Sequence, residues 1–189
     1  YPKESLPKKP TAAIADKKYG FFQTDKAFFQ DVASDMGMLP NKSGNDIGFE
    51  RQPLAYLVEA ADDICYNIID MEDAHRLGIV STSDCEDLFL DLIRSENQNL
   101  KRVEDKLTIL TNPNERISYL RAKVINALIN KSIELYQQNF SKILDGSLDK
   151  ALLDIYKADN PSLQEIEDFS IAKIYNHKNV IEIENAGYN

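Results

Sequence analysis

The sequence is poor in residue types on which several functional classes depend. Its 189 residues include two His, two Cys and no Trp, and no apolar run approaches the roughly 20 residues of a membrane span. Two cysteines argue against a disulfide scaffold, and we find no secretory signal. The sequence also has no Gly-rich phosphate loop, no Ser or Cys nucleophile motif and no Cys/His zinc pattern. We therefore expect a cytoplasmic protein that neither spans nor binds a membrane.

Positive charge is scarce as well. The chain has 22 Lys and Arg against 31 Asp and Glu, which gives a net charge of −9. A nucleic-acid-binding protein normally has the opposite sign. An acidic protein that handles a polyphosphate would need a bound metal or a local basic patch.

What the sequence does contain is helical periodicity with ordinary globular composition, 43% apolar and 28% charged. No segment reads convincingly as a strand, so we expect an all-α helical bundle. Ser83 and Glu86 fit a capping box for one of its helices. Helices are expected at 24–36, 51–77, from 83 onward, 98–110, 113–140, from 147 onward, 161–175 and 180–186.

Two of these helices carry specific expectations about burial. The helix at 24–36 should bury Phe28, Phe29 and Val32. The helix at 113–140 has an apolar stripe so wide that we expect burial on two sides, with Arg116 and Arg121 as ordinary surface residues. That stripe comprises Ile117, Leu120, Val124, Ile125, Leu128, Ile129, Ile133 and Leu135.

The helix at 51–77 is strongly acidic, with no basic residue between Arg51 and His75. At about 100° per residue, one side is apolar and the other is acidic. The apolar side is Leu54, Leu57, Val58, Ala61, Ile64, Cys65, Ile68 and Ile69. The other side is Glu59, Asp62, Asp63, Tyr66, Asp70 and Asp73. Two interpretations remain open: a solvated acidic face, or a face that presents a carboxylate to a cation, since hard cations prefer carboxylate oxygens.

The segment from Pro53 to Asp73, with its Ala-Asp-Asp triplet, resembles the signature helix of the bacterial dGTPase family. These are HD-domain deoxynucleoside triphosphate triphosphohydrolases. The resemblance implies that Asp62 is a metal ligand, and that Tyr66 and Asp70 line the deoxyribose and phosphate pocket. It also implies an HD-domain-like fold, here incomplete.

A second match lies near the start of the chain. Tyr1-Pro2 and the run from Lys17 to Phe22 resemble the family's Lys-Tyr-Pro and Lys-Tyr-Gly-aromatic motifs. The resemblance makes Lys18 and Tyr1 candidate phosphate or sugar contacts. We accordingly divide the chain into a basic loop and first helix bordering the site, 1–50, and a helical body, 51–189.

The other half of an HD-type metal site is missing from this sequence. Such a site uses a His…His-Asp pattern upstream of the signature helix, whereas His75 is followed by Arg76 and His177 by Lys178. The chain supplies at most one metal ligand, so we expect a partial enzyme that lacks that motif and the C-terminal end and is inactive alone.

For the complete enzyme, the resemblance implies hydrolysis of a deoxynucleoside triphosphate, with dGTP as the first candidate, to a deoxynucleoside and triphosphate. It also implies a divalent metal (Mg, Mn, Fe or Co) and a homo-oligomer such as a hexamer. Regulation by a dNTP or single-stranded DNA at a second site is a further implication. The alternative is a non-catalytic helical domain whose acidic face binds a basic partner.

Overall fold

The computed structural model describes residues 22–40, 48–96 and 99–187, and this part of the chain is helical. Within it no strand forms; the nearest feature is an isolated antiparallel bridge between Pro40 and Phe49. The expectation of an all-α bundle is confirmed, and the architecture is consistent with an HD-domain fold. The elements are η3 (Gln23–Asp25), α1 (Lys26–Asp35), α2 (Ala55–Ile64), η4 (Cys65–Ile69), α3 (Asp70–Arg76), α4 (Thr82–Ser95), α5 (Leu100–Ile109), α6 (Pro113–Gln138), α7 (Phe140–Leu144), α8 (Leu152–Asp159), α9 (Pro161–Phe169), η5 (Ser170–Tyr175) and α10 (Lys178–Gly187).

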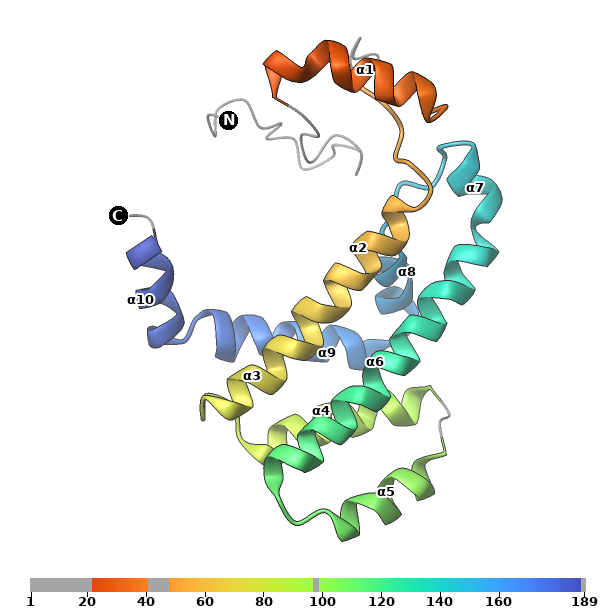
Figure 1. Cartoon of the computed structure of the whole chain (residues 1–189). Helices are drawn as coiled ribbons and strands as arrows, with labels where there is room; N and C mark the ends of the chain where they lie inside the picture. The colour runs from red at the N-terminus through yellow and green to blue at the C-terminus, as the bar shows by residue number, and fades with distance from the viewer. Residues whose placement is uncertain (1–21, 41–47, 97–98, 188–189) are drawn as a thin grey trace.

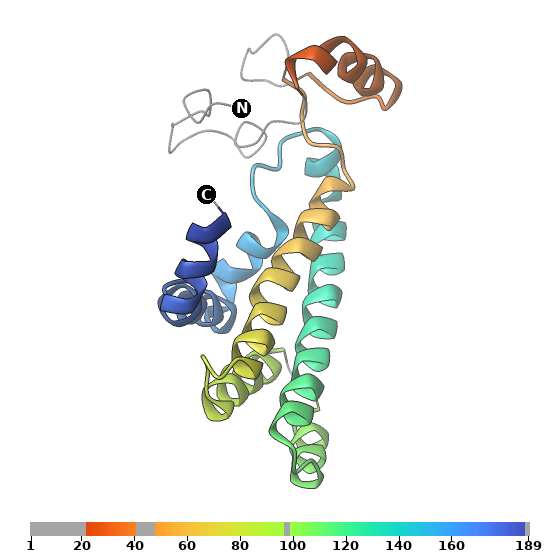
Figure 2. The ribbon, with the colours of Figure 1, turned by 60° about the vertical axis from the view of Figure 1, so that its left-hand side comes forward.

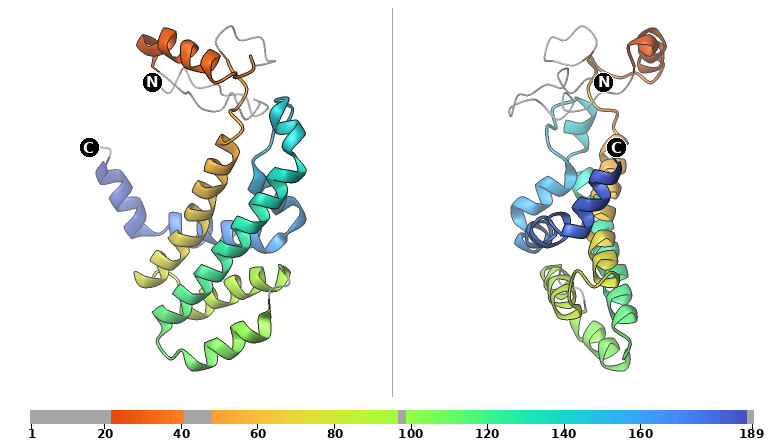
Figure 3. Two further views of the ribbon diagram at one scale, coloured as in Figure 1. Left: turned by 45° about the vertical axis from the view of Figure 1, so that its right-hand side comes forward. Right: turned by 90° about the vertical axis from the view of Figure 1, so that its left-hand side faces the viewer.

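Two long helical segments form the body of the molecule. One is the continuous run α2–η4–α3, and the other is α6, which lies beside it in the opposite chain direction (Figures 1 and 2). Helix α4 packs on α6 and on α9, and α8 packs on both α2 and α6. Segment η5 continues α9, and α10 then turns away from this run (Figure 3). The acidic helix therefore runs through the middle of the fold.

Four of the described helices, α4, α5, α6 and α9, begin at a side-chain cap. Asn112 and Asn160 accept hydrogen bonds from the first amides of α6 and α9, and a proline follows each of them at the first helical position, where its missing N–H costs nothing. Helix α4 is capped by Ser81, whose Oγ accepts from the Asp84 amide at 3.1 Å. The capping box expected from Ser83 and Glu86 is therefore not the cap of this helix, while the helix itself is present.

The hydrophobic core lies between α2, α3, α4, α6, α8 and α9. Five members of the predicted α6 stripe are buried in it, namely Ile117, Leu120, Val124, Leu128 and Leu135. The expected burial on a second side is wrong, because Ile129 and Ile133 each remain 46% exposed. One face of α6 packs, as it does in an ordinary bundle helix.

The first helix does not join this core. The prediction that it buries Phe28 and Val32 is wrong, since Phe28 is 73% exposed and Ala33 is its one buried residue among those described. Phe29 makes an edge contact with the Phe49 ring at 5.9 Å. Figure 3 shows α1 set apart from the rest of the ribbon.

Buried polar contacts tie distant segments to the core. The guanidinium of Arg116 makes a bidentate ion pair with Glu86 and donates to the Leu107 and Leu110 carbonyls. The phenol of Tyr56 donates to the Leu148 carbonyl at 2.6 Å. Arg116 is thus a structural link between α4, α5 and α6 rather than the ordinary surface residue we expected. None of the described helices is both long enough and apolar enough to cross a bilayer.

Candidate functional site

The acidic helix packs through a side that only partly matches the predicted one, since Ile64 and Ile68 of the predicted apolar side are buried. Tyr56, Ala60, Ile64 and Met71 are buried, as are Ile68, Asn67 and Glu72. Much of the predicted apolar side faces outward instead: Leu54 is 58% and Val58 69% exposed, and Ala61 and Cys65 are also exposed. The prediction placed these four residues in the core, whereas they form an outer apolar stripe on this helix.

The middle of this helix is not α-helical. Residues Cys65–Ile69 form a π-helical segment, in which the backbone bonds reach five residues instead of four. Within the segment, the side-chain amide of Asn67 donates a hydrogen bond to the backbone carbonyl of Asp63 at 2.8 Å. A uniform rotation per residue therefore fails past Ile64, and π segments of this kind occur frequently at functional sites.

The π segment also changes how the candidate residues line up. In an ideal α-helix, positions eight residues apart drift by about 80° around the axis. A wider π turn rotates less per residue, so it reduces the drift between Asp62 and Asp70. Asp62 is exposed, Tyr66 is 54% exposed and Asp70 is half-buried, which places all three on the open side of the helix.

Two of the predicted site residues contact a residue that sequence reasoning missed. Tyr175, at the end of η5, stacks on Tyr66 with ring centroids 5.0 Å apart and planes 18° from parallel. Its phenol donates to Asp70 Oδ2 at 2.9 Å and lies 3.4 Å from the Tyr66 carbonyl oxygen. Burial, with hydrogen bonds to Tyr66 and Asp70, raises the pKa of the Tyr175 phenol, so it remains a donor.

No local signal identified Tyr175 as part of this site. It follows Asp70 by 105 residues, and a tyrosine at the end of a helix normally belongs to the core. The signals that the sequence did offer, at Tyr1 and Lys18, lie outside the described residues. Their contacts with phosphate or sugar stay predictions.

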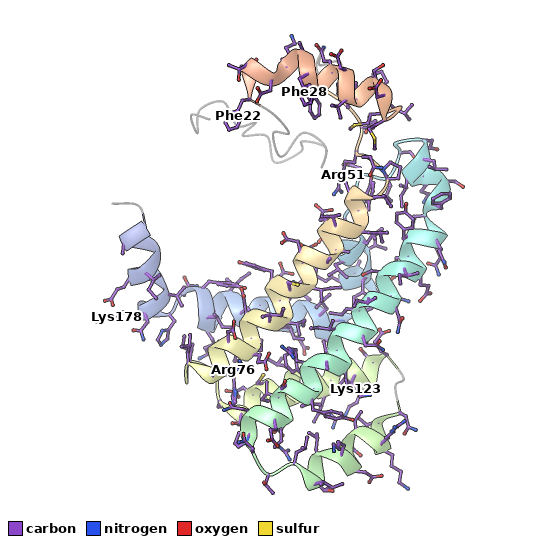
Figure 4. All side chains as sticks on the ribbon, viewed as in Figure 1. Phe22, Phe28, Arg51, Arg76, Lys123 and Lys178 are labelled. Atoms are coloured by element: carbon purple, nitrogen blue, oxygen red, sulfur yellow. The ribbon has the colours of Figure 1, made fainter. Side chains whose placement is uncertain are left out.

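The charges of the acidic helix are compensated from several directions. Arg51 pairs with Glu59 at 2.6 Å and lies over the Tyr56 ring at 4.3 Å. The carboxylate of buried Glu72 forms ion pairs with Arg76 through one oxygen at 2.9 Å and with Arg121 through the other at 2.7 Å. Arg121 therefore acts as a counterion from α6, and not as the ordinary surface residue that we expected. Figure 4 places Arg51 and Arg76 at the two ends of the acidic run.

Asp63, which follows Asp62, has a different environment. Burial, and then the negative charge of Glu59, raise the pKa of the Asp63 carboxyl above its ordinary value. Its nearest positive influence is Lys157, which is itself paired with Asp154 at 3.0 Å and Glu167 at 2.8 Å. The carboxylate of Asp63 thus faces α8, whereas that of Asp62 lies on the open side.

The residues that the structure describes do not by themselves make a metal centre. Among them, no group of three or more His, Cys, Asp or Glu side chains is arranged to hold an ion. His75 Nε2 lies 3.0 Å from Thr82 Oγ1, and His177 Nδ1 accepts from the Asn179 amide. Asp62 therefore fits a metal as one open carboxylate to which other ligands must be added.

The structure is that of an all-helical protein whose acidic helix has an exposed side that bears a tyrosine. Comparison with known sequences then shows which proteins this chain is similar to. Over the whole chain, the sequence is 34% identical to a deoxyguanosinetriphosphate triphosphohydrolase-like protein of Synechocystis sp. and 26% identical to a probable deoxyguanosinetriphosphate triphosphohydrolase of Pseudomonas aeruginosa. A deoxyguanosinetriphosphate triphosphohydrolase-like protein of Listeria monocytogenes is 29% identical over 99% of the chain. No protein-family model matches the sequence.

These matches cover this chain completely but only part of each relative. The chain spans about two fifths of the length of these curated relatives, namely 41%, 41% and 39%. The chain therefore belongs to the deoxyguanosinetriphosphate triphosphohydrolase family as a partial member. The resemblance drawn from the acidic helix is confirmed at the level of the family.

Proposed function

We propose that the protein to which this chain belongs hydrolyses a deoxynucleoside triphosphate, with dGTP as the first candidate, to a deoxynucleoside and triphosphate. Homology along the whole chain to proteins named for this reaction supports the proposal. The single structural observation that carries it is the open side of the acidic helix, where Asp62, Tyr66 and Asp70 lie on one continuous run of α2, η4 and α3.

The side chains on this surface match the parts of a nucleotide that they would have to bind. The exposed Tyr66 ring, stacked on Tyr175, offers a flat face against which a sugar can pack. The half-buried Asp70 carboxylate has its Oδ2 occupied by the Tyr175 phenol, which leaves Oδ1 to accept a hydrogen bond from the 3′-hydroxyl. Lys18 would balance phosphate charge, and Tyr1 would contact phosphate or sugar.

Asp62 is the residue that would contribute to a divalent metal. A carboxylate is a suitable ligand for Mg, Mn, Fe or Co, and the remaining ligands would have to come from outside the described residues. When bound, such an ion would activate water and polarise a phosphoryl oxygen. In the overall reaction, water adds to the α-phosphorus, its bond to the 5′-oxygen breaks, and that oxygen takes up a proton.

The proposal is tested by substituting Asp62 in the protein at its full encoded length. Triphosphate release from dGTP would be measured with Mg²⁺ and with Mn²⁺, for the wild type and for Asp62→Ala. We expect the substitution to abolish metal-dependent release, because the ion would lose a ligand. Wild-type protein that releases no triphosphate from any dNTP, or an Asp62→Ala variant with unchanged turnover, would contradict the proposal.

Asp73 supplies the matched control. It is an exposed Asp on the same helical run, three residues beyond Asp70, and it lies outside the proposed set. Asp73→Ala removes one negative charge from the same helix, so it should retain activity. Parallel losses in both variants would indicate a general effect of charge and not a role for Asp62.

A further inference from the structure

The contact between the two π-helical segments is the most unusual feature of the described structure that the proposed function does not require. One segment, η4, contains Tyr66 and leads directly into Asp70, and the other, η5, ends at Tyr175. π segments are rare and tend to occur at functional sites. Here the two rare segments meet through their tyrosine side chains, which suggests that the contact serves the site.

Within the described part of the chain, a single side chain makes all the polar contacts across this junction. The Tyr175 phenol oxygen is 2.9 Å from Asp70 Oδ2 and 3.4 Å from the Tyr66 carbonyl oxygen, while its ring stacks on the Tyr66 ring. A phenol carries one proton, and its shorter contact is to the carboxylate, which is the stronger acceptor. Tyr175 therefore fixes both the carboxylate of Asp70 and the ring of Tyr66.

Without this contact, neither group would be well constrained. Tyr66 is 54% exposed and projects from the open side of the helix. Asp70 begins α3 immediately after the π segment, and the one side-chain hydrogen bond described for its carboxylate is the one from Tyr175. A side chain that must meet a ligand hydroxyl gains affinity from being held in place before the ligand arrives.

We propose that Tyr175 is a positioning residue, which orients the Asp70 carboxylate toward the sugar 3′-hydroxyl and holds the Tyr66 ring beside it. This inference rests on the proposed function, because the sugar is assigned there. It adds a residue from the distant C-terminal part of the chain. In this role Tyr175 forms a hydrogen bond through its phenol oxygen, which a phenylalanine cannot do.

The kinetic test compares Tyr175→Phe with wild type, in the protein at its full encoded length, on dGTP and on 2′,3′-dideoxyguanosine triphosphate. The substitution keeps the ring and removes only the hydroxyl. We expect the KM for dGTP to rise about fivefold to tenfold with little change in kcat, as for a lost hydrogen bond that acts through binding. The KM for the dideoxy nucleotide should change less than twofold, because it has no 3′-hydroxyl for Asp70 to meet.

Tyr136→Phe is the control, since Tyr136 lies on α6 and its ring contacts Phe140. This variant should leave both KM values as in the wild type. Equal increases for the two nucleotides in Tyr175→Phe would overturn the positioning role, because a general structural effect does not distinguish a 3′-hydroxyl from a hydrogen.

A second measurement decides the contact without any nucleotide. Urea unfolding midpoints would be compared for wild type, Tyr175→Phe, Asp70→Ala and the double variant. If the phenol and carboxylate are coupled, the double variant should lose less stability than the two single changes summed. Additive losses would overturn the proposal. If the losses are non-additive and wild type turns over no dNTP, the proposed function fails while the Tyr175–Asp70 contact stands.

Discussion

The two cysteines show how strongly a residue's surroundings decide its chemistry. Sequence periodicity placed Cys65 on the core side of its helix, and it is exposed, while Cys85 on α4 is fully buried. Burial, and then the nearby charge of Glu72, raise the pKa of the Cys85 thiol from 9.0 to about 12. A buried thiol of this kind stays protonated and behaves as a small apolar side chain.

A pH effect on stability follows from Cys85. Because the folded pKa is raised, the unfolded thiol ionises first, so the unfolded state binds fewer protons above pH 9. The stability that the protonated Cys85 thiol contributes to the folded state is fully present below pH 9 and is lost as the pH rises toward 12. Between pH 8 and pH 9.5, we expect the free energy of unfolding to fall by about 1 kcal/mol from this group.

Urea unfolding at closely spaced pH values measures this effect. The Cys85→Ala variant should show a shallower decline over the same window, whatever its own starting stability. The Cys65→Ala variant, which removes the exposed thiol, should still show the decline in stability that Cys85 causes. If Cys85→Ala declines as steeply as wild type, the buried thiol is not the source.

At the scale of single elements, the α2–η4–α3 run combines two helical geometries, α and π, without a break in the chain path. Asn67 lies within its π segment, and its amide nitrogen donates to the Asp63 carbonyl at 2.8 Å. Its side-chain oxygen is buried and has no described partner. An Asn that bonds to a carbonyl four residues back offers the backbone an alternative to regular α-helical bonding.

Removing that amide should loosen the π segment. In Asn67→Ala the Asp63 carbonyl loses its side-chain donor, and we expect a loss of about 1 kcal/mol in the free energy of unfolding. Amide hydrogen exchange at Cys65–Ile69 should become faster, while exchange in α6 remains the same. Asn126→Ala, an exposed Asn in the middle of α6, is the control. Unchanged exchange at Cys65–Ile69 would mean that Asn67 does not hold this geometry.

At the scale of the whole molecule, burial differs between the packed body of helices and the first described helix. The body is built on α2, α4, α6, α8 and α9, with Phe89 of α4 completely buried among them. By contrast, Phe28 on α1 is 73% exposed. The division of the chain into 1–50 and 51–189 stays a prediction.

Two identical substitutions compare the contributions of these parts. Phe89→Ala should cost about 3–5 kcal/mol, since it opens a cavity in the core. Phe28→Ala should change the free energy of unfolding by less than about 0.5 kcal/mol, as is usual at an exposed site. Chemical denaturation of both variants provides the measurement. A large loss in Phe28→Ala would mean that α1 packs on the body more closely than its exposure indicates.

The sequence predicted the helices well because caps, prolines and apolar spacing act locally. Pro113 and Asn160 each begin a helix as expected, and the core side of α6 follows its stripe. The inner side of the acidic helix was predicted only in part. Ile64 and Ile68 are buried as expected, whereas Leu54, Val58 and Ala61, all of which precede the π segment, face outward although they are apolar. Tyr175 could not be found, since no pattern within one helix reports a partner 105 residues away.

That separation also affects how the site is made during synthesis. Ribosomes release the acidic helix long before they release Tyr175, so a nascent chain that has already folded α2 and α3 still lacks the phenol that engages Asp70. Stacking of the Tyr66 ring on Tyr175 must also wait until η5 has emerged and packed against the body. On the emerging polypeptide, the contacts of Tyr175 with Tyr66 and Asp70 therefore form only after α2 to α9 have left the ribosome, and a chain cut short before residue 175 would have those helices without these contacts.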